Sequence, residues 1–150
     1  NDIPSAMLLS ERQIGKDRAA AIKTYEQVLT KTPDNFVVLN NLAYLAFEDK
    51  NLTRAEELAK KAVSLQRENA DAVDTLAQIY VAKGDKAAAL KLYEEVSARP
   101  IANDDVYLNH VSVLLELDKK ALASRKLASR EFKSEAAKQR AESLKQQYGL

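Results

Sequence analysis

The sequence predicts an all-α fold, a solenoid built from about four stacked helix pairs. The main observation is a 34-residue period in alanine, seen at Ala21, Ala55, Ala89 and Ala123. A fixed period of about 20 to 50 residues is the signature of repeat architectures. A small side chain recurring at one phase is what a close helix crossing in every repeat requires. The composition agrees, because 46% hydrophobic residues with only three Gly and three Pro favour long helices and short connections.

Alignment at this period divides the chain into repeats. Four repeats result, at about 2–35, 36–69, 70–103 and 104–137. A polar end helix at about 132–148 is expected to cover the last of them. We expect a single domain over 1–150. Because the chain opens at Asn1 without a methionine, it can be a fragment of a longer array, with more repeats or a targeting segment before it.

Each repeat is expected to contain two helices. Candidate N-caps for the second helices recur at one phase: Asp17, Asn51 and Asp85, with Asp118 one residue early. Their side chains can accept hydrogen bonds from the first turn of a helix. In the second repeat, Thr53 and Glu56 also fit a capping box, which leaves open a start two residues later. Apolar residues follow helical spacing and no stretch alternates with period two, so no strands are expected.

The residues offer little for catalysis or metal binding. There is no cysteine, which excludes disulfides and thiolate chemistry, and three glycines cannot form a phosphate loop. The one histidine, His110, falls at a packed position and is expected to be a core residue. We therefore expect no catalytic residue, no metal, no cofactor and no enzymatic activity. No apolar run approaches the ~18 residues of a membrane span, so no direct membrane insertion is expected.

The third repeat carries a recognisable motif: Leu76-Ala77, Tyr80, Gly84, Ala89 and Tyr93. The second repeat keeps Leu42-Ala43 and Ala55, with Lys50 in place of the turn glycine. These residues resemble the tetratricopeptide repeat family. The resemblance implies a right-handed superhelix that serves as a protein–protein interaction module or scaffold. The runs Asn40-Asn41-Leu42-Ala43-Tyr44 and Asp74-Thr75-Leu76-Ala77 are similar to bacterial repeat proteins of envelope, exopolysaccharide or exosortase-linked systems.

In that family the first helix of each repeat lines a concave groove. Carried over by position, the resemblance places these residues there: Asn40, Asn41, Tyr44, Phe47, Glu48, Asp71, Asp74, Gln78, Val81, Asp105, Leu108, Ser112 and Leu115. The first repeat would add Ser10, Gln13 and Ile14. This predicts an acidic surface with one aromatic pair, which favours a peptide or helical segment that has apolar anchors and basic side chains.

Two alternatives stay open within this surface. Tyr44 and Phe47 either anchor a partner or pack against the neighbouring repeat. Asn40 and Asn41 either pair with the backbone of a bound peptide or link adjacent helices. An acidic groove disfavours nucleic acid as a partner.

One branch of the family clamps the carboxylate tail of chaperones with Lys, Asn and Arg. The positions that match over the first three repeats are Ala6, Ser10, Asn41, Asp71 and Thr75. Those that match from the second repeat onward are Asn40, Tyr44, Thr75, Asp105 and Asn109. Neither set can hold a carboxylate, and the two aspartates would repel one. The sequence therefore excludes a chaperone-tail function.

Charge is distributed unevenly along the chain. Residues 1–118 carry 14 basic and 19 acidic side chains, whereas residues 119–150 carry nine basic and three acidic ones. The basic end is either a solvated helix or a docking surface for an acidic partner or a sister chain. The alternative function is therefore a self-assembly element, a homo-oligomer within a larger bacterial envelope or secretion complex. The compartment stays open between bacterial cytoplasm and periplasm, with an envelope association favoured.

Overall fold

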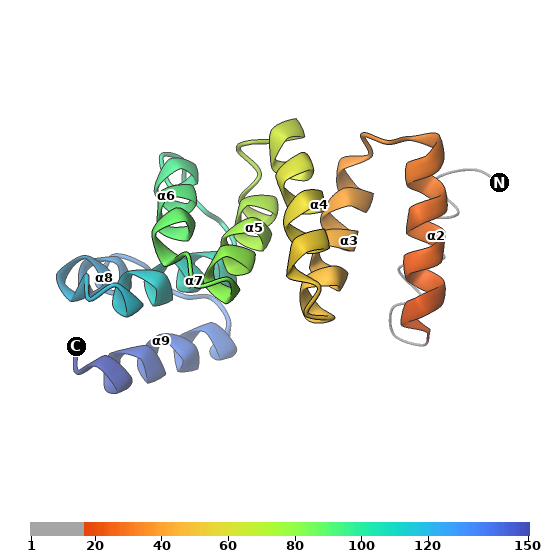
Figure 1. Cartoon of the computed structure of the whole chain (residues 1–150). Helices are drawn as coiled ribbons and strands as arrows, with labels where there is room; N and C mark the ends of the chain where they lie inside the picture. The colour runs from red at the N-terminus through yellow and green to blue at the C-terminus, as the bar shows by residue number, and fades with distance from the viewer. Residues whose placement is uncertain (1–16) are drawn as a thin grey trace. The chain divides into compact units, whose positions relative to one another are not determined.

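A computed structural model describes residues 17–150 of the chain. This part of the chain is helical and contains no strand, which confirms the predicted all-α class (Figure 1). The helices are α2 (Arg18–Lys31), α3 (Phe36–Glu48), α4 (Leu52–Leu65), α5 (Ala70–Ala82), α6 (Lys86–Val96), α7 (Asp104–Glu116), α8 (Lys120–Ala128) and α9 (Glu135–Tyr148). Ser10, Gln13 and Ile14, which were predicted to extend the groove, lie outside the described residues.

The chain divides into two compact units. The N-terminal unit is Asn1–Arg67, with α2, α3 and α4 in its described part, and the C-terminal unit is Glu68–Leu150, with α5 to α9. The division falls two residues before the expected start of the third repeat at 70. Within the units, α3 pairs with α4, α5 with α6, and α7 with α8. These are the helix pairs that the 34-residue period predicted.

The helix starts repeat at the predicted spacing. The first helices α3, α5 and α7 begin at 36, 70 and 104, and the second helices α2, α4, α6 and α8 at 18, 52, 86 and 120. The predicted caps Asp17, Asn51 and Asp85 each accept a hydrogen bond from the first turn of their helix. The Asn51 carboxamide accepts from the Arg54 amide at 3.2 Å, so the later start at Thr53 is wrong.

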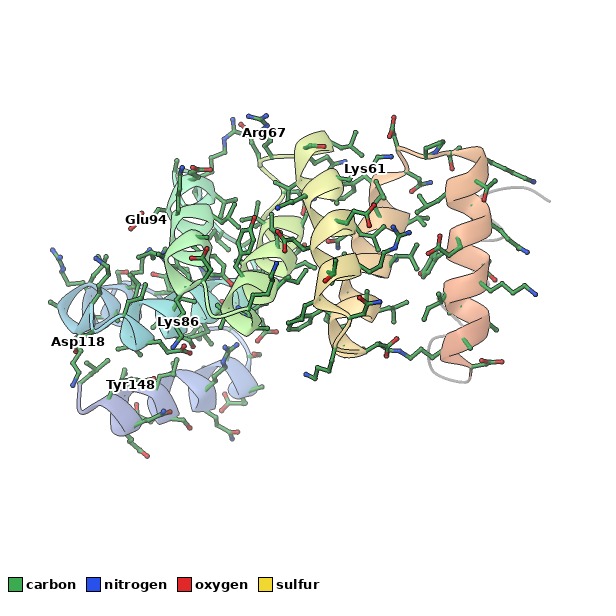
Figure 2. All side chains as sticks on the ribbon, in the orientation of Figure 1. Lys61, Arg67, Lys86, Glu94, Asp118 and Tyr148 are labelled. Carbon is green, nitrogen blue, oxygen red and sulfur yellow. The ribbon has the colours of Figure 1, made fainter. Side chains whose placement is uncertain are left out.

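The fourth cap was predicted wrongly. Asp118 does not cap α8; it lies in the turn before it with φ of 58° (Figure 2). Gly84, with φ of 86°, and Lys50, with φ of 63°, occupy the same position 34 and 68 residues earlier. Each helix pair therefore needs one left-handed residue in its turn, a conformation that glycine adopts most easily. Asp118 fills that position in the fourth repeat, and α8 begins without a side-chain cap.

The four periodic alanines lie in the core. Ala21, Ala55, Ala89 and Ala123 are all completely buried. Each belongs to a second helix, and in the three pairs that the structure describes that helix packs closely against its first helix. A methyl group at this point lets the two backbones approach, which is the role that the sequence predicted.

The last helix covers the end of the C-terminal unit. Helix α9 packs against α7 and α8, as the predicted end helix should (Figure 1). It begins at Glu135 rather than near 132, because Phe132 is buried in the preceding connection. Arg130 secures that connection by donating to Asp104 at 2.6 Å and to the Ile101 carbonyl at 2.6 Å.

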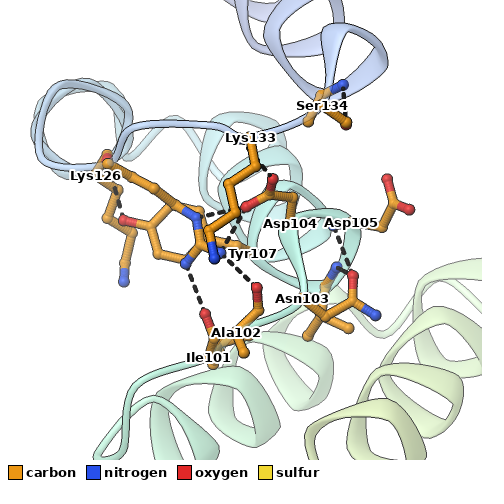
Figure 3. Close-up of polar contacts among 12 residues, drawn as sticks. Ile101, Ala102, Asn103, Asp104, Asp105, Tyr107, Lys126, Lys133 and Ser134 are labelled. Atoms are coloured by element: carbon orange, nitrogen blue, oxygen red, sulfur yellow. Dashed lines mark hydrogen bonds and ion pairs between the residues drawn. The ribbon is translucent and has the colours of Figure 1, made fainter.

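Further contacts lock the same connection (Figure 3). The Lys133 amide donates to Asp104, and the Arg130 guanidinium stacks 4.4 Å from the centre of the Tyr107 ring. The hydrogen bond from Arg130 is the main reason that the pKa of Asp104 is lowered. Because the connection is tied to α7, the start of α9 is fixed beside that helix. Within residues 17–150, no helix is both long and apolar enough to cross a membrane.

Enlarging a periodic alanine should destabilise the fold. Ala89→Leu places three extra carbon atoms at a buried crossing and is expected to cost about 1–3 kcal/mol of unfolding free energy. Ala87→Leu is the matched control, because Ala87 is exposed on the same helix α6. Urea unfolding followed by circular dichroism measures both. Equal effects of the two variants would show that the crossing has room for a larger side chain.

Candidate functional site

In the N-terminal unit, α3 presents two large apolar side chains to solvent. Tyr44 is 51% exposed and Val37 is 43% exposed. They lie seven residues apart, which is two helical turns, so they share one face of α3. The opposite face is buried through Val38, Leu39 and Leu42. Tyr44 therefore stands where the family resemblance predicted a contact with a partner.

The acidic residue beside Tyr44 is paired within the unit. Glu48 receives a hydrogen bond from Arg18 at 2.6 Å, and this bond is the main reason that the pKa of Glu48 is lowered. The Tyr44 hydroxyl also bonds to Glu48, which raises the pKa of Tyr44. Phe47 is half-buried, with the Lys50 ammonium 5.8 Å from its ring centre. The predicted aromatic pair thus has one open member, Tyr44, and one that is partly covered.

The two asparagines of α3 differ in their surroundings. The Asn41 side chain donates to the Tyr25 hydroxyl on α2 at 3.0 Å. This contact is the helix link that the sequence left open for Asn41. The Asn40 carboxamide oxygen is buried and has no hydrogen-bond partner among the described residues. Asn40 therefore keeps unused hydrogen-bonding capacity on the face that bears Tyr44.

In the C-terminal unit, two predicted aspartates are exposed. Asp71 accepts a hydrogen bond from Asn103 at 3.0 Å, and Asp105 lies 3.7 Å from the guanidinium of Arg140 on α9. The Asp105 side chain is 80% exposed. These carboxylates keep acceptor capacity toward solvent, which suits a partner with basic side chains.

Asp74, in contrast, belongs to a partly buried polar network. One of its oxygens accepts from the Tyr93 hydroxyl at 2.5 Å, and both accept from Asn109, at 2.9 and 3.0 Å. Gln78 donates to the same Tyr93 hydroxyl at 2.8 Å. Burial raises the pKa of Asp74, while the bonds from Tyr93 and Asn109 oppose this shift. Asp74 and Gln78 thus join α5 to α6, and Asp74 also joins α5 to α7.

The remaining predicted residues are largely covered. Leu108 is completely buried and Leu115 is 3% exposed, so neither presents a contact surface to a partner in this structure. Both leucines lie on α7, which packs against α5, α6, α8 and α9. Ser112 is half-buried and donates to the Leu108 carbonyl, and Val81 is half-buried.

The N-terminal unit also contains cavities that the sequence analysis did not predict. One, of about 160 Å³, lies between α2, α3 and α4 and is lined by Ile22, Leu42, Leu45, Ala46 and Leu58 among others. A second, of about 300 Å³, shares the Arg54–Glu26 pair and Leu58 with it. None of the predicted groove residues lines either cavity. No sequence pattern marks them, because they depend on how closely α2 approaches α4.

His110 has no part in an open site. It is 2% exposed, stacks on Tyr93 with ring centres 5.2 Å apart, and bonds to the Ser97 hydroxyl at 3.2 Å. Burial, with a smaller effect of Lys126, lowers the pKa of His110 to about 4. The expectation of a core histidine is confirmed. Residues 17–150 contain no group of acidic or histidine side chains that could hold a metal ion.

Comparisons with known proteins identify the repeats. The tetratricopeptide repeat family model matches residues 46–107. A tetratricopeptide repeat protein from Parabacteroides merdae has a similar structure, with a TM-score of 0.79 and 18% identity, over 98% of this chain and 60% of that one. The first tetratricopeptide repeat domain of Spaghetti, bound to the HSP90 peptide SRMEEVD, has a TM-score of 0.70 and 21% identity, over 77% of this chain and 95% of that one.

A mutant O-GlcNAc transferase from Thermobaculum terrenum is also similar, with a TM-score of 0.69 and 21% identity, over 75% of this chain. The match covers only 22% of the transferase and three fifths of the Parabacteroides protein. At these identities the likeness concerns the fold alone. No curated protein matches the chain in sequence.

The buried histidine should make the fold sensitive to mild acid. Its pKa is lowered from about 6.5 when unfolded to about 4 when folded. The folded state therefore resists protonation, and this contribution to stability is present above about pH 6.5 and is lost between about pH 6.5 and 4. We expect it to lower the unfolding free energy by on the order of 1–2 kcal/mol between about pH 7.5 and 5.

His110→Leu is the test, because leucine is an apolar residue of similar size that cannot take up a proton. The variant should lose that part of the pH dependence, which urea unfolding at several pH values measures. Unchanged pH dependence in the variant would mean that His110 accepts a proton in the folded protein.

Proposed function

We propose that the chain is a tetratricopeptide repeat scaffold that binds a peptide or helical segment along its first helices. The fold supports a protein–protein interaction module in general. The binding residues would be those exposed on α3 in the N-terminal unit and on α5 and α7 in the C-terminal unit. Because the helices within each unit pack on one another, the exposed side chains of each unit are ordered before the partner arrives, which lowers the entropy lost on binding.

One observation carries this proposal, the exposure of Tyr44. It is a large side chain, half in solvent, in a unit whose other large apolar residues are mostly buried. Tyrosine supplies broad contact area with little loss of rotamer freedom, which is why it is common where proteins bind one another. Val37 on the same face adds an apolar contact.

Charge favours a basic partner. Asp71 and Asp105 are exposed on the first helices of the C-terminal unit, and carboxylates attract Lys and Arg. The SRMEEVD peptide of the Spaghetti complex carries Glu-Glu and a terminal Asp. The same two aspartates would repel such a sequence here, so we propose that the partner of this chain differs from it in charge.

Selection from a random peptide library, followed by affinity measurement, tests the proposal. Selected peptides should combine apolar and basic residues and bind less tightly as salt is raised. The double variant Tyr44→Ala, Phe47→Ala should lose at least about tenfold in affinity while the melting temperature changes little. Leu65→Ala is the control, since Leu65 is 42% exposed on α4, a second helix. A large fall in the melting temperature of the double variant would instead indicate that Tyr44 and Phe47 pack against the neighbouring repeat.

Self-assembly is the second candidate. It rests on the exposed basic side chains of the C-terminal end, with Lys119, Lys120 and Arg125 on and before α8. A sister chain could offer them its acidic residues. Light scattering at two salt concentrations decides this, because an electrostatic oligomer should dissociate as salt rises. A monomer at low salt and high protein concentration would remove the candidate.

A further inference from the structure

Arg140 extends from α9 onto the inner face of α7. Its guanidinium donates to the Asn109 carboxamide oxygen at 2.5 Å and lies 3.7 Å from an Asp105 oxygen. Asp105 and Asn109 are four residues apart, which places them one turn apart on the same face of α7. Asp105 belongs to the set that the family resemblance assigned to partner binding. A basic side chain of the chain itself therefore occupies part of that surface.

The Asn109 carboxamide is oriented so that its oxygen can accept a hydrogen bond from a guanidinium group. Its amide nitrogen donates to both oxygens of Asp74, at 2.9 and 3.0 Å. A carboxamide has donors only on nitrogen and acceptors only on oxygen, so this contact turns the Asn109 oxygen toward Arg140. Asp74 is itself held by the Tyr93 hydroxyl. The orientation of this acceptor is thus set by the contact of Asn109 with Asp74.

The helix that carries Arg140 is held by a small apolar contact. Its fully buried residues are two alanines, Ala137 and Ala141. Leu144 and Tyr148 are half-buried. Because hydrophobic stabilisation scales with buried apolar area, the two buried methyl groups of α9 contribute little. Polar links such as the Arg140–Asn109 bond therefore matter for keeping it in place.

We propose that Asp105 and Asn109 form a subsite for a guanidinium group of the partner, and that Arg140 is its built-in occupant. The proposal rests on the proposed function, since it concerns the same inner face and a basic partner. Guanidinium suits the subsite because its planar fork offers several donors to two neighbouring acceptors, which an ammonium cannot match. Arg140 then competes with the partner, and binding of a partner arginine releases the hold of α7 on α9.

The test uses the full chain and a small probe, N-acetyl-arginine amide. Binding is followed by NMR through the side-chain amide signals of Asn109. Arg140→Gln should bind the probe at least about fivefold more tightly than the natural chain, because the competing group is gone. The citrulline analogue of the probe, which is neutral but similar in shape, should not bind.

Lys138→Gln is the matched control. Lys138 lies on the same helix and pairs with Glu135 at 2.7 Å, so the variant changes the charge equally without touching α7. Equal gains from Lys138→Gln and Arg140→Gln would overturn the proposal, as would equal binding of the citrulline analogue. Adding Asn109→Leu to Arg140→Gln should abolish binding, and binding that survives this change also counts against the subsite.

Amide hydrogen exchange of α9 shows whether Arg140→Gln loosens that helix, and the probe experiment remains decisive if it does. A loosened α9 leaves the subsite open, so tighter probe binding is still expected, and its absence overturns the proposal. Arg140→Lys, which keeps the charge, should give an intermediate affinity for the probe.

The outcome of this test is separable from that of the proposed function. A probe that binds while the peptide library yields nothing supports the subsite and contradicts the peptide groove. Selected peptides that bind without any arginine support the peptide groove and contradict the guanidinium subsite.

Discussion

Close approach of two helices at a methyl-sized residue is the constraint on which the rest of this structure depends. Ala21, Ala55, Ala89 and Ala123 are completely buried at one phase of a 34-residue period. In each pair that the structure describes, this alanine lies on the second helix, which packs on the first. A larger residue would push the pair apart and turn the exposed faces of the first helices. The positions of Tyr44 and Asp105 are thus set by contacts on the other side of their helices.

The sequence was sufficient to predict the helices, because periodic features are local. The apolar spacing and the caps at Asp17, Asn51 and Asp85 each act within one or two turns, and the 34-residue period repeats them along the chain. The first helices have their own caps at the same period, Asn35, Asn69 and Asn103, so the sequence also contains a signal for these starts. Asp118 shows the limit of such reasoning, since the same residue type suits a cap and a left-handed turn. Only its alignment with Gly84 could have separated the two.

The candidate site was less predictable, because exposure depends on neighbours outside the repeat. Family position assigned Leu108 to the groove, yet it is completely buried in a unit where α9 packs on its helix. Asp74 reads as a surface carboxylate in sequence but is engaged by Tyr93 and Asn109, residues 19 and 35 positions away. A one-dimensional pattern contains the position of a residue on its helix. It does not contain the identity of the side chain that meets it across an interface.

A polar residue on an inner face can either hold the scaffold or meet a partner, and hydrogen-bonding capacity decides which. Both oxygens of Asp74 are occupied within the unit, so replacing either contact with one to a ligand would leave a buried donor unpaired. Asp105 is mostly exposed and has a single long ion pair, so it can exchange that pair at little cost. Recognition is therefore expected to concentrate on exposed side chains such as Tyr44 and Asp105. Partly buried neighbours such as Asp74 instead hold the helices of the C-terminal unit together.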